Sequence, residues 1–234
     1  MSTRRNPGTD VALIAAFAAL VAVCALLPAI KVAGPVPITL QTFAVLLSGA
    51  VLGMRRGFLA VLLYVVAGAA GLPIFSGGAA GLAVLTGPTA GYLIGFPLAA
   101  GLCGAIVERL PRRSLVSPVA IFCAGLVSSA LCIHTLGMAG LVLRADLTWA
   151  QAWDIDKIFW LGDVLKNVAM ALVATAVHRA FPGLLDRPAA PVPAGQGQPE
   201  GTPTAWAGSV SSRSPSRSRP TTASAASSTR PRSS

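Results

Sequence analysis

Hydrophobic residues form long runs along this chain, and short polar or Gly- and Pro-containing segments separate them. The runs predict six membrane-crossing helices at about residues 11–30, 38–53, 57–71, 89–107, 116–143 and 158–177. They lack the two-residue alternation of a membrane β-strand. A helix satisfies its own backbone hydrogen bonds in lipid. The pattern therefore predicts an all-α, polytopic membrane protein with six transmembrane helices in one bundle.

Basic residues between these runs predict an orientation. With the N-terminus inside, nine arginines of the first 187 residues face the cytoplasm, whereas Lys31, Arg144 and Lys157 face outward. Cytoplasmic loops carry the excess of Lys and Arg. We therefore predict a multi-pass protein of the cytoplasmic membrane with both termini in the cytoplasm. The polar segment 144–157 is predicted to be an outer loop.

Composition supports a membrane domain at 1–187 and a different segment after it. The chain has 234 residues, of which 54% are hydrophobic and only 11% charged, whereas soluble domains average about 25% charged residues. Residues 188–234 are rich in Pro, Ser, Thr and Arg and have no helical period. That composition is typical of a disordered tail. We favour a solvated tail over one that contacts anionic lipid, and we predict no nucleic-acid partner.

Several function classes are disfavoured by missing motifs. The four cysteines lie inside apolar runs without CxxC or Cys/His spacing, so they are interpreted as buried thiols, and no metal site is predicted. The motif GxxxxGK[ST] is absent, so this chain is not expected to be an ATPase.

The stretch 72–96, LPIFSGGAAGLAVLTGPTAGYLIGF, is too rich in Gly for an ordinary helix and too apolar for an ordinary surface loop. Glycine permits bent backbone and close approach of another group. We interpret the stretch as one wall of a small-molecule site, with Phe75, Gly87 and Tyr92 as candidate contacts. Gly87, Gly91 and Gly95 are four apart, which predicts a close-packing face if the helix begins early.

Charge inside the last predicted span marks the polar part of that site. Ionisable residues in membrane helices are costly and usually mark a function or a partner. Asp163, Lys166 and Asn167 share one helix face with Trp160. At about 1.5 Å per residue, Asp163 is predicted to lie roughly 8 Å below the outer end of its span. The alternative is a self-neutralising pair without a function.

These three side chains suit binding better than catalysis. Asp163 offers only acceptors, Lys166 only donors, and Asn167 both. They match a head group with N–H donors beside a carbonyl, as in a urea or an amide, and no nucleophile accompanies them. Gln41 and Thr42 would add hydrogen bonds, or else cap their own helix.

Two further polar residues are interpreted as structural. His134 is interpreted as a packed side chain in its helix, and Glu108 as the partner of nearby arginines. A membrane-embedded enzyme using Glu108, His134 and Asp163 is disfavoured, because the predicted topology puts Glu108 at the inner face and Asp163 near the outer one. We predict no catalytic residues and no enzyme.

Small residues repeat along the first span. Ala12 and Ala16 are four apart, as are Ala15 and Ala19. Such spacing makes a flat face for another helix, although an Ala-rich chain also produces it by chance.

The segments PVPITLQTFAVLLSGAVLGMRRG, LPIFSGGAAGLAVLTGPTAGYLIGFPLAA and LGDVLKNVAMALVA together resemble the BioY family. Its members are the biotin-specific substrate-capture components of energy-coupling factor (ECF) transporters. The resemblance covers residues 1 to about 181, and GPTAGYLIGFP and GD-x-x-K are its most specific parts.

The resemblance implies a six-helix protein with a biotin pocket open to the outside. It also implies a transmembrane coupling (T) component and two cytoplasmic ATPases as partners, so that ATP hydrolysis belongs to them and this chain needs no cofactor. Asp163 and Lys166 would bind the biotin ring, and Asn167 is predicted to bind it as well. Another vitamin is the alternative ligand.

By the same resemblance, the alanines of the first span would dock on the T component. Phe75, Tyr92 and Trp160 would pack the apolar parts of biotin. Lys31, or backbone N–H groups of the Gly-rich stretch, would receive its carboxylate.

Overall fold

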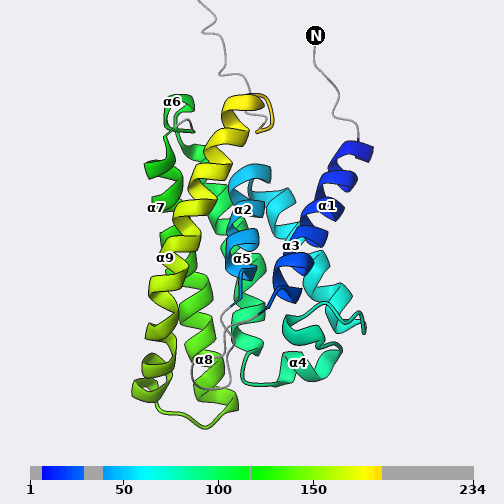
Figure 1. Ribbon diagram of the computed structural model, residues 1–234, viewed down its shortest axis with the longest axis vertical. Helices are drawn as coiled ribbons and strands as arrows, with labels where there is room; N and C mark the ends of the chain where they lie inside the picture. The colour runs from blue at the N-terminus through cyan, green and yellow to red at the C-terminus, as the bar shows by residue number, and fades with distance from the viewer. Residues whose placement is uncertain (1–6, 29–38, 116, 186–234) are drawn as a thin grey trace, which may run out of the picture. The chain divides into compact units, whose positions relative to one another are not determined.

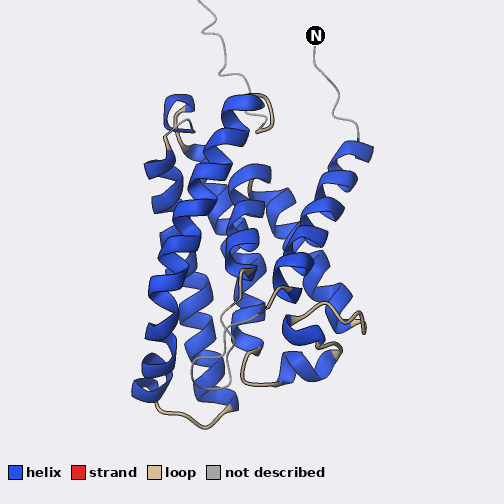
Figure 2. Cartoon of the chain, viewed as in Figure 1, coloured by secondary structure: helices blue, strands red, loops and turns tan. Residues whose placement is uncertain are grey.

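The computed structural model describes residues 7–28, 39–115 and 117–185, and these ranges contain helices and no strand (Figure 2). The all-α prediction is therefore confirmed for the described residues. The predicted tail and Lys31 lie outside them. The elements are α1 (Pro7–Leu26), α2 (Gln41–Leu52), α3 (Met54–Ala69), η1 (Ser76–Gly78), α4 (Leu82–Thr86), α5 (Ala90–Arg109), α6 (Arg112–Leu115), α7 (Pro118–Ser128), η2 (Ser129–His134), α8 (Thr135–Arg144) and α9 (Trp149–Ala180).

Four helical segments of the described chain are long and apolar enough to cross a membrane. They are Pro7–Leu26, Ala90–Arg109, Pro118–Arg144 and Trp149–Ala180. The third joins α7, η2 and α8 end to end. The apolar helix α2 is shorter, at 12 residues, and α3 has 16.

Helix α5 lies at the centre of the bundle (Figure 1). It packs against α2 and α3, and also against the α7–α8 segment, while α9 covers α2, α7 and α8, and α1 packs on α3 and α2. Glycines allow the contact with the α7–α8 segment. A Cβ on Gly91 would collide with the Leu136 carbonyl, and one on Gly95 would lie 2.6 Å from the Cys132 carbonyl oxygen. The predicted close-packing face is confirmed for these two glycines, whereas Gly87 precedes α5.

A one-residue corner joins α2 to α3. Gly53 has φ 83°, a conformation that favours glycine. Met54, Arg55 and Arg56 therefore begin α3, whereas the predicted spans 38–53 and 57–71 left them between two helices. The Glu108 carboxylate accepts a hydrogen bond from the Met54 N–H at 2.9 Å. It thus satisfies a free donor at the start of α3, a different role from the predicted pairing with arginines.

Arg56 ties three parts of the chain together at the same end of the bundle. Its guanidinium donates to the Leu184 carbonyl at 2.7 Å and lies 3.3 Å from an Asp10 carboxylate oxygen. The start of α1, the start of α3 and the segment after α9 therefore meet here.

The last helix begins much earlier than predicted. Residues 149–157 were predicted to be loop, yet α9 starts at Trp149. Thr148 and Gln151 form a reciprocal capping box, in which the Thr148 hydroxyl accepts from the Gln151 N–H at 3.3 Å. This motif satisfies orphan donors at a helix start. At about 1.5 Å per residue, Asp163 lies roughly 21 Å from the start of α9, whereas the predicted depth of 8 Å was counted from residue 158.

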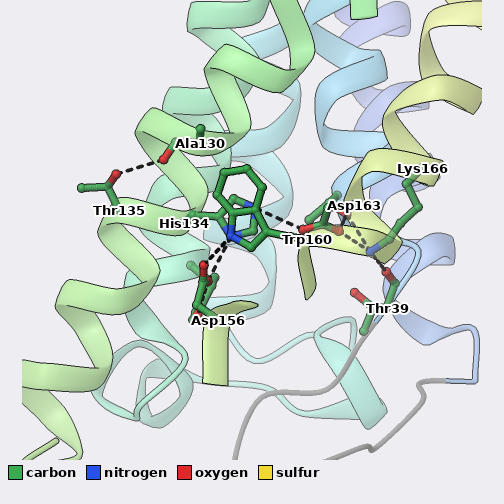
Figure 3. Close-up of polar contacts among 10 residues, drawn as sticks. Thr39, Ala130, His134, Thr135, Asp156, Trp160, Asp163 and Lys166 are labelled. Atoms are coloured by element: carbon green, nitrogen blue, oxygen red, sulfur yellow. Dashed lines mark hydrogen bonds and ion pairs between the residues drawn. The ribbon is translucent and has the colours of Figure 1, made fainter. Parts of the chain in front are cut away.

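A wide turn interrupts the α7–α8 segment. Residues 129–134 are π-helical, and the Thr135 hydroxyl donates to the Ala130 carbonyl at 2.9 Å (Figure 3). Turns of this kind occur mostly as single interruptions of α-helices, often at functional sites. His134 is the last residue of the turn.

Candidate functional site

A cavity of about 730 Å³ lies between the C-terminal end of α1, the N-terminal end of α2, the Gly-rich stretch and α9. This volume is in the range of small-molecule pockets. Its lining residues are Leu26, Leu27, Pro28, Thr39, Gln41, Thr42, Phe75, Ser76, Gly77, Ala79, Val84, Thr89, Tyr92, Leu93, Phe96, Ile133, His134, Phe159, Asp163 and Lys166. The stretch 72–96 supplies nine of them, so it forms much of one wall.

The polar wall of the cavity is an ion pair held by two threonines. Lys166 Nζ lies 2.5 Å from Asp163 Oδ1. The Thr42 hydroxyl donates to Asp163 Oδ1 at 3.0 Å and accepts from Lys166 Nζ at 3.0 Å. Lys166 also donates to the Thr39 carbonyl at 2.9 Å (Figure 3). An ammonium has three donors, and here each one has a partner within the protein.

The opposite wall is aromatic and rests on a small-residue contact. Phe75 meets Tyr64 edge-on, with ring centroids 5.6 Å apart, and its ring fills the space that a side chain at Gly68 would need. The Gln41 amide donates to the Tyr64 hydroxyl at 2.8 Å. Phe75 is thereby fixed at the edge of the cavity, although it belongs to a loop.

A second polar cluster lies behind the cavity, around Asp156. This side chain is 0% exposed. Its carboxylate accepts from the Tyr92 hydroxyl at 2.9 Å and from the Trp160 Nε1–H at 3.0 Å. His134 Nδ1 lies 2.9 Å from Asp156 Oδ2 and 3.0 Å from Oδ1 (Figure 3). The Trp160 ring stacks on the His134 ring at 4.6 Å.

His134 joins the two clusters. Its other ring nitrogen, Nε2, lies 3.4 Å from Asp163 Oδ2. The buried Asp156 cluster therefore contacts the cavity carboxylate through one imidazole.

Five of the eight predicted ligand contacts line the cavity, namely Asp163, Lys166, Tyr92, Phe75 and Gln41. The other three lie elsewhere. Gly87 is the C-cap that follows α4. The Trp160 ring stacks on His134, and its indole N–H donates to Asp156. Asn167 turns toward α7, where its amide donates to the Phe122 carbonyl at 2.9 Å.

The sequence analysis assigned no role to Asp156 and did not predict the polar contacts of His134. Asp156 was assigned to a loop, and the capping box that begins at Thr148 was the signal that would have placed it on a helix. His134 was interpreted as a packed side chain, whereas it contacts two carboxylates. Among the described residues, no group of three side chains is arranged to hold a metal ion.

The small-residue face of α1 points away from the bundle. The four alanines predicted to dock on a partner are all exposed, namely Ala12, Ala15, Ala16 and Ala19. The buried residues of α1 are Ala18, Val21, Cys24 and Ala25.

Fold and site together define a multi-pass membrane protein with a small-molecule cavity. The BioY family model matches residues 1–183, and the chain belongs to the BioY family.

Two relatives and one solved structure illustrate the similarity. The chain is 39% identical to "Biotin transporter BioY" of Rhizobium etli over 186 residues, which covers 78% of this chain and 97% of the relative. It is 43% identical to "Biotin transporter BioY" of Rhodobacter capsulatus over 188 residues, covering 75% of this chain and 96% of the relative. The fold is similar to the crystal structure of the S-component for biotin from an ECF-type ABC transporter, with a TM-score of 0.71, 21% identity, and coverage of 76% of this chain and 95% of that one.

Proposed function

We propose that this chain captures biotin as the substrate-binding subunit of an ECF-type ABC transporter in the cytoplasmic membrane. The observation that carries the proposal is the polar wall of Asp163, Lys166 and Thr42 on an otherwise mostly apolar cavity. The names of the relatives favour biotin over another vitamin. As a transporter subunit, the chain is not an enzyme.

The polar wall suits the ureido ring of biotin. Asp163 accepts from ring N–H groups, and Lys166 donates to the ring carbonyl. Thr42 bridges the two side chains and orients both. The ring systems and the aliphatic chain of biotin would pack on Phe75, Tyr92 and Phe159.

Binding at Lys166 is an exchange of partners. Because all three of its donors have partners within the protein, the biotin carbonyl must replace one of these partners. The Thr39 carbonyl is the partner best suited to leave, since the other two, Asp163 and Thr42, also bond to each other. A buried amine keeps its hydrogen bonds throughout such an exchange, which limits its cost.

The carboxylate of biotin would lie toward the Gly-rich stretch. Ser76, Gly77 and Ala79 line that part of the cavity, and backbone N–H groups there would receive it. Lys31 is the other candidate and lies outside the described residues.

The transporter assignment implies a T component and cytoplasmic ATPases, which hydrolyse ATP while this chain uses no cofactor. The exposed alanines of α1 suit close docking of a T-component helix. We further propose six membrane spans, formed by the four long segments together with α2 and α3, and cytoplasmic termini. The arginine rule supports this orientation, since Arg56 in the first turn of α3 bonds to Leu184 just beyond α9, and Arg179 lies in the last turn of α9. The cavity, in contrast, is lined by the last residues of α1 and the first residues of α2.

Biotin binding to the detergent-purified full chain tests the proposal. We expect saturable binding, and labelled biotin should be displaced by biotin but not by a panel of other vitamins. Absence of biotin binding, or displacement by a different vitamin alone, would overturn the assignment.

Co-purification with candidate T and ATPase subunits, with and without biotin, tests the partnership. We expect Ala16→Trp to reduce recovery of the T component, because a large side chain prevents close docking. Leu172→Trp is the matched control, since Leu172 is exposed on α9. Equal recovery with both variants would count against docking through α1.

A further inference from the structure

Asp156 lies among hydrogen-bond donors. The Tyr92 hydroxyl donates to Oδ1 and the Trp160 indole N–H to Oδ2, and His134 Nδ1 lies 2.9 Å from Oδ2. Only an ionised carboxylate accepts at both oxygens without donating. Because Asp156 is 0% exposed, its charge needs a cation nearby.

His134 is the basic side chain in contact with Asp156. Its Nδ1 faces both oxygens of Asp156, at 2.9 and 3.0 Å, so Nδ1 carries a proton. Its Nε2 faces Asp163 Oδ2 at 3.4 Å. A neutral ring protonated at Nδ1 would place a lone pair near that second carboxylate oxygen, whereas an imidazolium would place a positive charge there at ion-pair distance.

The charge count agrees with the protonated ring. The groups facing His134 are Asp156 and Asp163 from α9, with Tyr92 of α5 behind the first and Lys166 behind the second. With His134 charged, two anions balance two cations. With His134 neutral, one uncompensated negative charge would remain where side chains are at most 14% exposed, which is costly.

We propose that His134 is an imidazolium that bridges Asp156 and Asp163, and that it is a positioning residue for ligand capture. This rests on the proposed biotin function. His134 holds Asp163 Oδ2 from behind, so that Oδ1 stays with Thr42 and Lys166 on the cavity wall. Asp156 in turn fixes the plane of the imidazole, together with the stacked Trp160.

Nitrogen NMR of the ¹⁵N-histidine-labelled full chain, without biotin, reads the protonation state directly. The sequence has only two histidines, His134 and His178. His178 Nε2 lies 2.8 Å from the Ala50 carbonyl, so His178→Gln assigns the two signals and serves as the matched control. We expect both nitrogens of His134 to be protonated at neutral pH. A neutral tautomer of His134 would overturn the proposal.

Biotin affinity of His134→Gln tests the positioning role. Glutamine donates a hydrogen bond but carries no charge, so we expect about tenfold weaker binding at neutral pH, the loss of one charge-assisted contact. We also expect His134→Gln/Asp156→Asn to recover part of the loss. A folded His134→Gln with wild-type affinity would refute the role. If this variant does not fold, the NMR result decides. Wild-type protein that binds no biotin would refute the proposed function and leave the protonation state standing.

Discussion

Helix α9 carries two Asp–Lys pairs with the same spacing. Asp154 and Lys157 are three residues apart with a contact of 2.6 Å, and Asp163 and Lys166 are three apart with a contact of 2.5 Å. The first pair is exposed, at 64% and 53%, and the second is enclosed, at 11% and 14%. The first pair is open to solvent, whereas the second is surrounded by Thr39, Thr42 and His134.

The difference shows that spacing creates a pair but its surroundings give it a function. Exposed ion pairs contribute little, because water and salt screen them. An enclosed pair depends on the groups that satisfy its remaining donors and acceptors. The predictions below remove these groups one by one, and the exposed pair serves as the reference.

The largest effect is expected from truncating the enclosed pair. Asp163→Ala or Lys166→Ala should lower biotin affinity by about 100-fold, because each removes a charged hydrogen-bonding group and leaves its partner unpaired. Isothermal titration or labelled-biotin binding measures this loss. Unchanged affinity in both variants would remove Asp163 and Lys166 from the site.

Removing the bridge between the two charges should have a smaller effect. Thr42→Val keeps the shape of the side chain but deletes the hydroxyl that contacts both Asp163 and Lys166. We expect about tenfold weaker biotin binding, in line with the loss of hydrogen bonds to charged groups. Thr86→Val is the control, because the Thr86 hydroxyl is exposed and bonds only locally to Ala83. Equal affinities of the two variants would contradict the bridging role.

Tyr92→Phe should have a weaker effect still. It keeps the ring on the cavity wall but removes one of the donors to Asp156. A hydrogen bond to a charged group contributes about 1.5–3 kcal/mol to stability, but Tyr92 acts on Asp163 only through Asp156 and His134. We therefore expect the melting temperature to fall and biotin binding to weaken only by a few-fold. Both are measured on the purified full chain. A loss as large as that of Asp163→Ala would mean that the hydroxyl contacts biotin itself.

Truncating the exposed pair should have almost no effect on biotin affinity or on stability. Asp154→Ala and Lys157→Ala are expected to leave biotin affinity unchanged and to alter stability by no more than about 0.5 kcal/mol. Thermal unfolding in detergent at low and high salt provides the measurement. If either change lowered affinity as the enclosed variants do, the contrast between the two pairs would be broken.

The sequence predicted the enclosed pair because a charge inside an apolar run is conspicuous. Asp163 and Lys166 lie between apolar residues on both sides, so their cost in a membrane helix marked them. Asp156 escaped notice for the opposite reason. It lies between Asp154 and Lys157, and three charged residues within four positions are typical of a surface loop.

Contacts across the bundle could not be predicted from spacing. Asn167 shares a face with Asp163 by its position, yet its side chain turns to the Phe122 carbonyl on another helix. The partners of His134 lie 22 or more residues later in the chain. Only the packing of α9 against the α7–α8 segment brings them together.

The wide turn at 129–134 lets the segment hold one residue more than a regular helix would hold between the same two faces. One residue rotates an α-helix by about 100°, so regular winding of all six residues would rotate one flank against the other. Gly125 before the turn accommodates Asn167 and Met170 of α9, and Gly137 after it accommodates Tyr92 of α5. A regularly wound segment of the same length could keep one of these contacts and would lose the other. The extra residue and the wide turn that absorbs it are therefore inherited together.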